Sequence, residues 1–341
     1  MRKLKGVLRV PAGRETAKGS SSAGRRGVLA ACVVAVLIAA WPGRSVLAAD
    51  APDACLIRLQ GIINEAYAEA ILRKIDDARE LGAKTIILEM DTFGGEVVSS
   101  MRFADAISKQ DDLRIVTYIN PYAFSAGTMV ALACDEIYID AAVGKMGDVA
   151  PINMATGEEM GEKQQAPIRK TLETYAEKRG YSVPLVHAMV SKQFEVFRIY
   201  LADDPAPQYI TGTELELNKS DEFLKKIVKK EIIVRRGELL TLTAKGAVEL
   251  GFARKAVGSR EGLFDELGVD PGKVKRLYLS PSERLLAVVD TFSMVFIGLG
   301  LILFYMELNQ PGFGLPGILG LTCFAAFFLI KFSLHYAHML E

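Results

Sequence analysis

The sequence predicts an α/β domain made of repeated strand–helix units and followed by C-terminal transmembrane helices. From Cys55 onward, short apolar runs rich in β-branched residues alternate with helical patterns, which is typical of this fold class. Two glycine-containing turns each follow a strand-like run and open a helical pattern. Toward the C-terminal end, two apolar stretches are each long enough to cross a bilayer.

The alternation defines a series of expected elements in the first half of the domain. The pattern predicts strands at residues 55–59, 85–90, 114–119 and 136–139. It predicts helices at residues 64–81, 97–108 and 126–133, and Gly82 is expected to end the first of them.

Beyond residue 152 the predicted elements are less regular. Residues 153–165 are polar and predict a mobile loop, whereas residues 168–179 and 185–197 show helical patterns. A charged, helix-compatible run at residues 219–230 precedes an expected strand at 231–234. Short elements are expected at residues 244–250 and 262–267, and the domain as a whole is assigned to residues 52–280.

The first 48 residues have the organisation of a signal peptide. They carry nine basic residues and one acidic residue, and an apolar run of 15 residues from Gly27 to Trp41 follows the basic region. A helix needs about 20 apolar residues to span hydrocarbon, so cleavage after about Ala48 is favoured over a permanent anchor. We therefore expect residues 1–48 to be a signal peptide and the domain to be exported.

The two apolar stretches, residues 285–308 and 313–334, are predicted to be transmembrane helices. Four basic residues at positions 273, 275, 276 and 284 precede the first stretch, and the positive-inside rule would place them in the cytoplasm. The leader favours the opposite orientation. Because a cleavable leader usually dominates, we expect a multi-pass protein of the cell membrane with its domain on the extracytoplasmic, periplasmic side.

Charge and cysteine usage exclude several classes of function. The chain has 41 basic and 41 acidic residues, and beyond the leader 32 basic residues face 40 acidic ones, which gives no basic surface for nucleic acid. Cys55 and Cys134 lie in apolar surroundings and are expected to be buried free thiols rather than a disulfide. No histidine or cysteine spacing typical of metal ligands occurs, so we expect neither a metal nor a cofactor.

The two glycine-containing turns hold the first candidates for chemistry. The carboxyl ends of neighbouring parallel strands face one crevice, so the turns at Gly94–Gly95 and at Ser125 are expected to meet there. Adjacent glycines let backbone N–H groups approach a substrate closely, as an oxyanion hole requires. The simpler interpretation is that the glycines form a tight turn and that Ser125 is a helix N-cap.

A serine nucleophile also needs a base that accepts its proton. His187 is the only histidine in the predicted soluble domain, but it lies among apolar residues and is expected to be structural. A buried lysine can serve instead, because desolvation disfavours the ammonium form. The candidates by position are Lys145, Lys163, Lys170, Lys178 and Lys192, and the pattern alone does not choose among them.

Several motifs in order resemble those of one family. They are MDTFGG at residues 90–95, FSAG at 124–127, GKMGDVAPI at 144–152, LTLTA at 240–244 and NQPGFG at 309–314. On these motifs the chain resembles NfeD-type membrane-bound serine proteases, which are relatives of signal peptide peptidase A. The resemblance covers about residues 55–267 and the membrane part, and it implies a ClpP/crotonase-like fold.

The resemblance also implies a Ser–Lys dyad. Ser125 occupies the position of the nucleophile, and the base aligns with Lys163, with Lys170 as the alternative. Gly94, Gly95 and Ala126 would then bind the oxyanion or the substrate. The implied substrate is an apolar stretch of a membrane protein, with a stomatin- or prohibitin-like protein as partner, and a homo-oligomer is implied as well.

Two features depart from the family's usual pattern. Phe93 stands where relatives usually have proline, which places a bulky ring near the expected substrate groove. Many relatives continue into further spans and a small OB-like barrel, so this sequence is interpreted as a short form or a truncated chain. A catalytically weak membrane scaffold that organises stomatin-like proteins, and crotonase-like acyl-CoA chemistry, are the competing functions; export disfavours the latter.

Overall fold

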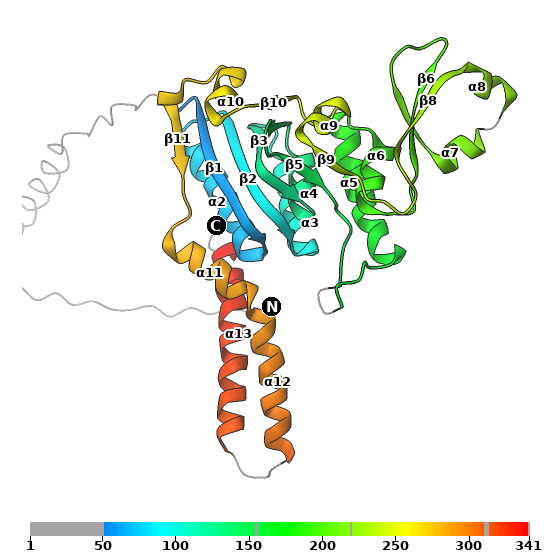
Figure 1. Ribbon diagram of the computed structural model, residues 1–341. Coiled ribbons are helices and arrows are strands. Elements are labelled where there is room, and N and C mark those ends of the chain that lie inside the picture. The colour runs from blue at the N-terminus through cyan, green and yellow to red at the C-terminus, as the bar shows by residue number, and fades with distance from the viewer. Residues whose placement is uncertain (1–50, 154–155, 219, 310–313, 340–341) are drawn as a thin grey trace, which may run out of the picture. The chain divides into compact units, whose positions relative to one another are not determined.

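The computed structural model describes residues 51–339, except 154–155, 219 and 310–313 (Figure 1). The predicted signal peptide lies outside the described residues. The main sheet has the strand order β10-β4-β3-β2-β1-β11, and β5 pairs with β3 and β9 beside this path. Its strands are β1 (Ala54–Ile63), β2 (Thr85–Gly95), β3 (Arg114–Phe124), β4 (Glu136–Asp140), β5 (Lys145–Gly147), β9 (Thr241–Thr243), β10 (Lys255–Val257) and β11 (Val274–Leu277).

All pairings in the main sheet are parallel except the one between β5 and β9. Parallel strands need crossover connections, and helices supply them. These helices are α2 (Glu65–Glu80), α3 (Val97–Ser108), α4 (Ala126–Ala133), α5 (Glu162–Arg179), α6 (Val183–Val190), α9 (Ala244–Glu249) and α10 (Arg260–Leu267). The α/β prediction is confirmed, and each strand predicted between residues 55 and 139 is present and longer than expected, the fourth by one residue.

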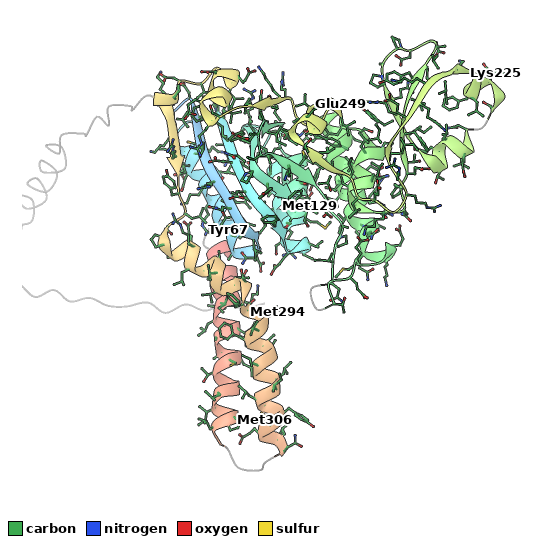
Figure 2. The ribbon with its side chains drawn as sticks, viewed as in Figure 1. Tyr67, Met129, Lys225, Glu249, Met294 and Met306 are labelled. Atoms are coloured by element: carbon green, nitrogen blue, oxygen red, sulfur yellow. The ribbon has the colours of Figure 1, made fainter. Side chains whose placement is uncertain are left out.

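The two faces of the sheet are covered by different elements because side chains alternate along each strand. Ile57, Leu88 and Met129 belong to the larger core, which packs the sheet against α2 to α6. Figure 2 labels Met129, which belongs to α4 and lies beside the sheet. Leu56 and Ile87 point to the other face, where α10 covers a smaller core. Burial on both faces explains why these strands are nearly continuous apolar runs.

A second, three-stranded sheet corrects two predicted helices. It has the antiparallel order β7-β6-β8, with β6 (Val196–Leu201), β7 (Gln208–Thr211) and β8 (Ile227–Val234), and the short helices α7 (Gly212–Leu217) and α8 (Asp221–Lys226) accompany it. The helix predicted at 185–197 therefore ends at Val190, and the helix-compatible run at 219–230 becomes α8 followed by β8. Pairing of β6 with both neighbours overrides the local helical pattern.

The loop predicted at residues 153–165 is shorter than expected. Ile152 pairs with Glu159 as an isolated bridge, and α5 begins at Glu162, so residues 162–165 are helical. Polar, solvent-exposed side chains at 162–164 hid this helical turn from the sequence pattern. The consequence is that Lys163 lies in the first turn of a helix.

The C-terminal part contains α11 (Pro281–Thr291), α12 (Ser293–Asn309) and α13 (Leu315–Met339). Among the described residues, α13 is long and apolar enough to cross a membrane, whereas α11 and α12 pass that test only as a pair bent by 46°. The stretch predicted at 285–308 is therefore broken near Phe292. Figure 1 shows α12 and α13 side by side, and Glu307 of α12 accepts hydrogen bonds from the Gly314 and Gly317 N–H groups at 2.7 and 2.9 Å.

A buried polar cluster joins these helices to the domain. Asn64 caps α2 and also donates from Nδ2 to the Ala287 carbonyl of α11 at 2.7 Å. The buried Asp290 carboxylate accepts from the Ala66 N–H at 3.3 Å and from Lys331 Nζ of α13 at 2.8 Å. One carboxylate thus links α2, α11 and α13.

Lys331→Met should destabilise this junction. Breaking a buried ion pair by removing one partner leaves the other charge uncompensated, and we expect a cost of about 3 kcal/mol. The measurement is the midpoint of thermal unfolding of the detergent-solubilised full chain. Lys255→Met is the matched control, because Lys255 pairs with Glu266 at the exposed surface, where a pair contributes at most about 1 kcal/mol. Equal midpoints for the two variants would contradict the account.

Candidate active site

The two predicted turns meet at the carboxyl ends of β2 and β3. These strands pair in parallel as far as Thr92 and Ala123, so the residues that follow are neighbours. A Cβ placed on Gly94 would lie 2.7 Å from Ser125 Cβ and 3.0 Å from Ser125 Oγ. Gly94 is therefore packed directly against the Ser125 side chain, as the topology predicted.

Ser125 has an unusual backbone conformation between a strand and a helix. Its φ and ψ are 53° and −118°, a region that L-residues rarely adopt and that costs about 1–3 kcal/mol. Its hydroxyl makes no capping hydrogen bond to α4. Ser125 is thus not a conventional N-cap, and the simpler interpretation of this residue does not hold. A strained serine at a strand-to-helix turn is also how other hydrolases present a nucleophile.

Contacts from β5 and α4 hold this conformation. The Ser125 N–H donates to the Gly147 carbonyl at 3.1 Å, and the Ser125 carbonyl accepts from the Met129 N–H at 3.1 Å. The buried Thr128 hydroxyl contacts the Ala123 and Gly147 carbonyls and accepts from the Gly147 N–H at 2.8 Å. The surrounding hydrogen bonds fix both neighbours of the turn, which lets the strain persist.

The backbone donors near Ser125 differ in availability. The Ala126 N–H makes no hydrogen bond within the part of the chain that the structure describes, as expected for the first residue of a helix. The Gly94 N–H donates to Thr92 Oγ1 at 3.0 Å. Gly95 lies against the Ile63 backbone, where a Cβ would come within 2.0 Å of the carbonyl oxygen. Of these groups, the Ala126 N–H remains available to a ligand, the Gly94 N–H is already hydrogen-bonded, and Gly95 allows the close approach of β1.

Three aromatic rings surround the turn. Phe93 is 72% exposed, and its ring centroid lies 4.9 Å from that of Tyr122 and 6.0 Å from that of Phe124. Tyr122 and Phe124 are themselves 5.6 Å apart. These residues form an aromatic shelf immediately before Ser125, in which Phe93 is exposed and Tyr122 and Phe124 are partly buried. The sequence had placed Phe93 near this groove, but not the two rings that pack with it.

The candidate lysines occupy different environments. Lys170 pairs with Glu173 at 2.6 Å, and this hydrogen bond and charge raise the pKa of Lys170, which disfavours it as a base. Lys178 and Lys192 contact Asp111 and Glu159, and Lys145 lies over the Tyr122 ring. Lys163 is exposed and makes no ion pair or hydrogen bond within the described part of the chain, including none to Ser125. Its role as the base stays a prediction.

Other titratable groups do not complete the site. His187 lies in a separate pocket beside Glu173, and burial lowers the pKa of its imidazole. Cys55 and Cys134 are buried free thiols, as predicted, and burial raises the pKa of the Cys134 thiol to about 12. No group of metal-ligating side chains occurs among the described residues.

Sequence reasoning missed Thr92 and Thr128. The Thr92 hydroxyl bridges the Gly61 carbonyl of β1 and the Gly94 N–H, and Thr128 fixes β5 beside Ser125. Thr92 precedes Gly94 and Thr128 follows Ser125 by a few residues. A single threonine at such a position has no sequence pattern that indicates a role in the site. Only the position of β5 between β3 and β9 explains why Thr128 is needed.

Two family models match the chain in agreement with this geometry. The model of the NfeD1b N-terminal domain matches residues 54–214, and the model of the NfeD integral membrane domain matches residues 291–341. The chain belongs to the NfeD family. Within this NfeD chain, the first match contains Gly94, Ser125 and Lys163, and the second contains α12 and α13.

Known proteins similar to this NfeD chain include a curated relative and solved structures. Membrane protein NfeD1b of Bacillus subtilis is 27% identical over 280 residues, which are 80% of this chain and 55% of that protein. A membrane-bound stomatin-specific protease, solved as a lysine variant with a substrate peptide, is 17% identical, with a TM-score of 0.50 over 71% of this chain and 99% of its own. A membrane protease specific for a stomatin homologue, from Pyrococcus horikoshii, is 16% identical, with a TM-score of 0.44 over 69% of this chain and 97% of its own. The fold is that of ClpP-like proteases, and the chain spans about half the length of NfeD1b.

Gly94→Ala should displace Ser125 and slow its reaction with a fluorophosphonate at least tenfold. The added methyl meets Ser125 Cβ at 2.7 Å, and φ at Gly94 is +117°. Gly251→Ala is the matched control, since Gly251 has φ +78° but nothing within 4 Å of an added Cβ. The rate of fluorophosphonate labelling is compared between the two variants. The comparison separates the effect of the collision with Ser125 from that of adding a methyl group to a glycine with positive φ. A control that loses labelling equally would show that the contact with Ser125 is unimportant.

Thr128→Val should loosen the turn while keeping the shape of the side chain. The substitution leaves the buried Gly147 N–H without its acceptor, at a cost of about 1–3 kcal/mol. Chemical denaturation of the full chain in detergent measures this loss. Ser100→Ala is the control, because the Ser100 hydroxyl is equally buried and has no hydrogen-bond partner in the described structure. If both variants lose the same stability, the hydroxyl of Thr128 has no special role.

Proposed function

We propose that this chain is a membrane-anchored serine endopeptidase in which Ser125 is the nucleophile and Lys163 the base. The observation that carries the proposal is the strained, uncapped Ser125 packed against Gly94 at the end of the sheet. In a structural turn, the hydroxyl would cap α4 and the backbone would relax. A conformation that costs free energy and frees the hydroxyl is expected where the hydroxyl reacts.

The proposed reaction follows from the groups around Ser125. Its Oγ attacks the carbonyl carbon of a peptide bond while the Lys163 amine accepts the hydroxyl proton. The Ala126 N–H stabilises the oxyanion that forms, together with the Gly95 N–H or with the Gly94 N–H once it leaves Thr92 Oγ1. The protonated lysine then gives its proton to the leaving amine, and water hydrolyses the acyl-enzyme through the same base.

The base must approach Ser125 when a substrate is bound. The Gly147 carbonyl accepts a hydrogen bond from the Ser125 N–H, and Gly147 lies 16 residues before Lys163 in the sequence. Within the segment between them, Ile152 and Glu159 pair as an isolated β-bridge. Catalytic hydrogen bonds often tighten only in the complex. A substrate strand lying between the turn and the start of α5 would also exclude water from the Lys163 amine, as a lysine base requires.

The proposed substrate is an apolar segment of a membrane protein. The aromatic shelf of Phe93, Tyr122 and Phe124 supports this choice, because its exposed Phe93 ring offers apolar contact beside the proposed nucleophile. The structures similar to this chain include stomatin-specific proteases, which supports a stomatin- or prohibitin-like partner. We further propose a protease domain at residues 52–280 facing the periplasmic side, spans at 285–308 and 313–334, and a homo-oligomer.

One observation favours a second candidate function. Lys163 is solvent-exposed and makes no hydrogen bond to Ser125 in the described structure. A membrane scaffold with a weak or absent active site would tolerate this arrangement. Such a scaffold would bind stomatin-like proteins through its surface and helices without cleaving them.

Labelling of the detergent-solubilised full chain with a fluorophosphonate tests the dyad. Wild type should label, Ser125→Ala should lose labelling, and Lys163→Ala should slow it by a factor of about 100 or more, which is the usual contribution of a general base. Ser99→Ala is the control, because Ser99 is a partly exposed serine on α3 whose hydroxyl donates a hydrogen bond to Glu96 at 2.9 Å. Covalent adducts are counted by intact-protein mass spectrometry.

The variants also separate the alternatives. Labelling that survives Ser125→Ala would end the assignment of the nucleophile. Loss of labelling in Lys170→Ala but not in Lys163→Ala would move the base to Lys170. Absence of labelling in the wild type, with stomatin-like proteins still bound, would favour the scaffold.

A further inference from the structure

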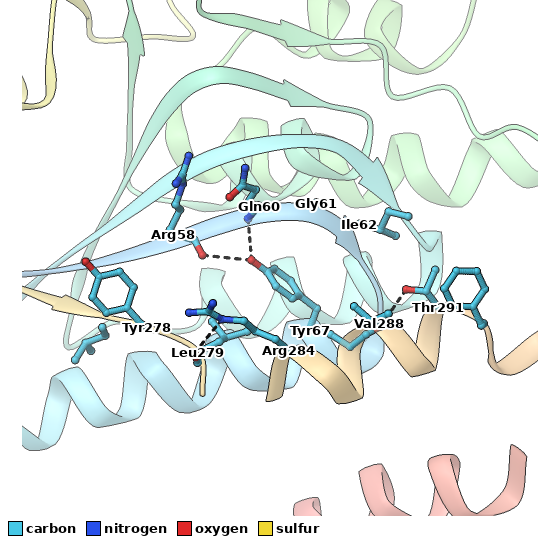
Figure 3. A pocket seen from close by; sticks show the side chains of 13 residues that line it. Arg58, Gln60, Gly61, Ile62, Tyr67, Tyr278, Leu279, Arg284, Val288 and Thr291 are labelled. Carbon is cyan, nitrogen blue, oxygen red and sulfur yellow. Dashed lines mark hydrogen bonds between the residues drawn. The ribbon is translucent and has the colours of Figure 1, made fainter. Parts of the chain in front are cut away.

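A pocket of about 600 Å³ lies where the edge of the main sheet meets α11 (Figure 3). Its walls come from the end of β1, from Tyr67 of α2, from β11 and the segment after it, and from α11. This volume is within the usual range for sites that bind small molecules. Neither Ser125 nor Lys163 lines the pocket, so it is distinct from the candidate active site.

Two arginines give the pocket a positive charge that nothing in it balances. Arg58 and Arg284 line it, no lining residue is acidic, and neither arginine forms an ion pair with another described residue. Tyr67 lines the same pocket; burial raises its pKa, and the positive charges of both arginines oppose that rise. Two unpaired cations at one cavity indicate an anionic ligand.

The polar wall between the arginines is rigid. Figure 3 shows the Tyr67 hydroxyl between Gln60 and Arg58: it accepts from the Gln60 N–H at 2.7 Å and donates to the Arg58 carbonyl at 3.3 Å. Arg284 donates from Nε to the Leu279 carbonyl at 3.1 Å. This bond orients the guanidinium and leaves its terminal amino groups for a ligand.

The mouth of the pocket is apolar and continues onto the membrane helices. Ile62, Val288 and Phe292 line it and are 56%, 56% and 55% exposed. Phe292 is the residue between α11 and α12, and α12 carries further exposed apolar side chains such as Met294, which Figure 2 labels. An apolar path therefore leads from the arginines to the surface that a membrane would cover.

We propose that this pocket binds an anionic phospholipid. Its phosphate would lie between Arg58 and Arg284, and an acyl chain would follow Val288 and Phe292 onto α12. Basic pockets at the membrane end of a helical segment are suited to lipid headgroups. Inorganic phosphate would make no contact with the apolar mouth of the pocket. A zwitterionic lipid would place its own positively charged group next to the two arginines.

Native mass spectrometry of the detergent-solubilised full chain tests the site, with dioctanoyl phosphatidylglycerol as the probe. We expect one lipid to bind at saturation, and dioctanoyl phosphatidylcholine to bind much more weakly. The double variant Arg58→Gln/Arg284→Gln should weaken phosphatidylglycerol binding about 30-fold, because each arginine contributes on the order of one charge contact at a membrane surface. Arg235→Gln/Arg236→Gln is the matched control, since these exposed arginines carry the same charge and do not line the pocket.

Three outcomes would overturn the proposal. Equal binding of both lipids would show that the arginines do not select an anion. Unchanged binding in the Arg58/Arg284 variant would show that the lipid binds elsewhere. An equal loss of binding in the Arg235/Arg236 control would show that binding depends only on net charge. Full competition by millimolar inorganic phosphate or by an apolar peptide would identify a different ligand. Thermal unfolding of the double variant without lipid, unchanged from wild type, confirms that the comparison uses folded protein.

Discussion

The conformation of Ser125 is the constraint on which the candidate site depends. A serine with positive φ persists only because β5 and Thr128 fix the backbone on both sides of it. The same turn brings the side chain against Gly94, where no larger residue fits. The parallel sheet makes this possible, since it aligns the ends of β2 and β3 and gives β5 a position beside them. The reactivity we propose is therefore a property of the strand ends rather than of the serine alone.

The membrane helices are connected to the same part of the sheet. Asn64 follows β1 directly, caps α2 and reaches α11, and Asp290 links α2 to α13. Just before Asn64, Ile62 and Ile63 of β1 pair with Gly94 and Gly95 of the neighbouring strand β2. Asn64, which contacts α11, is therefore the chain neighbour of Ile63, the residue that pairs with Gly95 in the turn beside Ser125. The lipid pocket borders the same junction, because Ala287 and Thr291 line it together with the exposed Arg58 and Ile62 of β1.

The sequence predicted those elements whose pattern is set by burial. Strands buried on both faces and the helix at residues 126–133 could be predicted because apolar runs and periodicity report burial directly. The small sheet was predicted only at residues 231–234, which form the end of β8. β6 and the start of β8 were not predicted, because they gain their structure from pairing with each other and their local pattern resembles a helix. The start of α5 was missed for a related reason, since residues 162–164 are polar and exposed.

The candidate site was predictable only in part. Glycines after strands and a serine before a helix indicated the turns at Gly94 and Ser125, and the structure brings these two together. Thr128 and the ring of Tyr122 gave no local signal, because their importance comes from β5 and from Phe93, which are distant in sequence. The choice of Lys163 came from a resemblance, and its exposed amine leaves the dyad as a proposal.

A crystal structure of the chain with a peptidyl phosphonate covalently bound to Ser125 is the most direct test. The account predicts that Ser125 keeps its positive φ and that the phosphoryl oxygen lies about 3 Å from the Ala126 nitrogen. It also predicts the Lys163 amine within hydrogen-bond reach of Oγ. A phosphoryl oxygen that faces solvent, with Ser125 relaxed to a negative φ and the lysine still remote, would contradict the central claim.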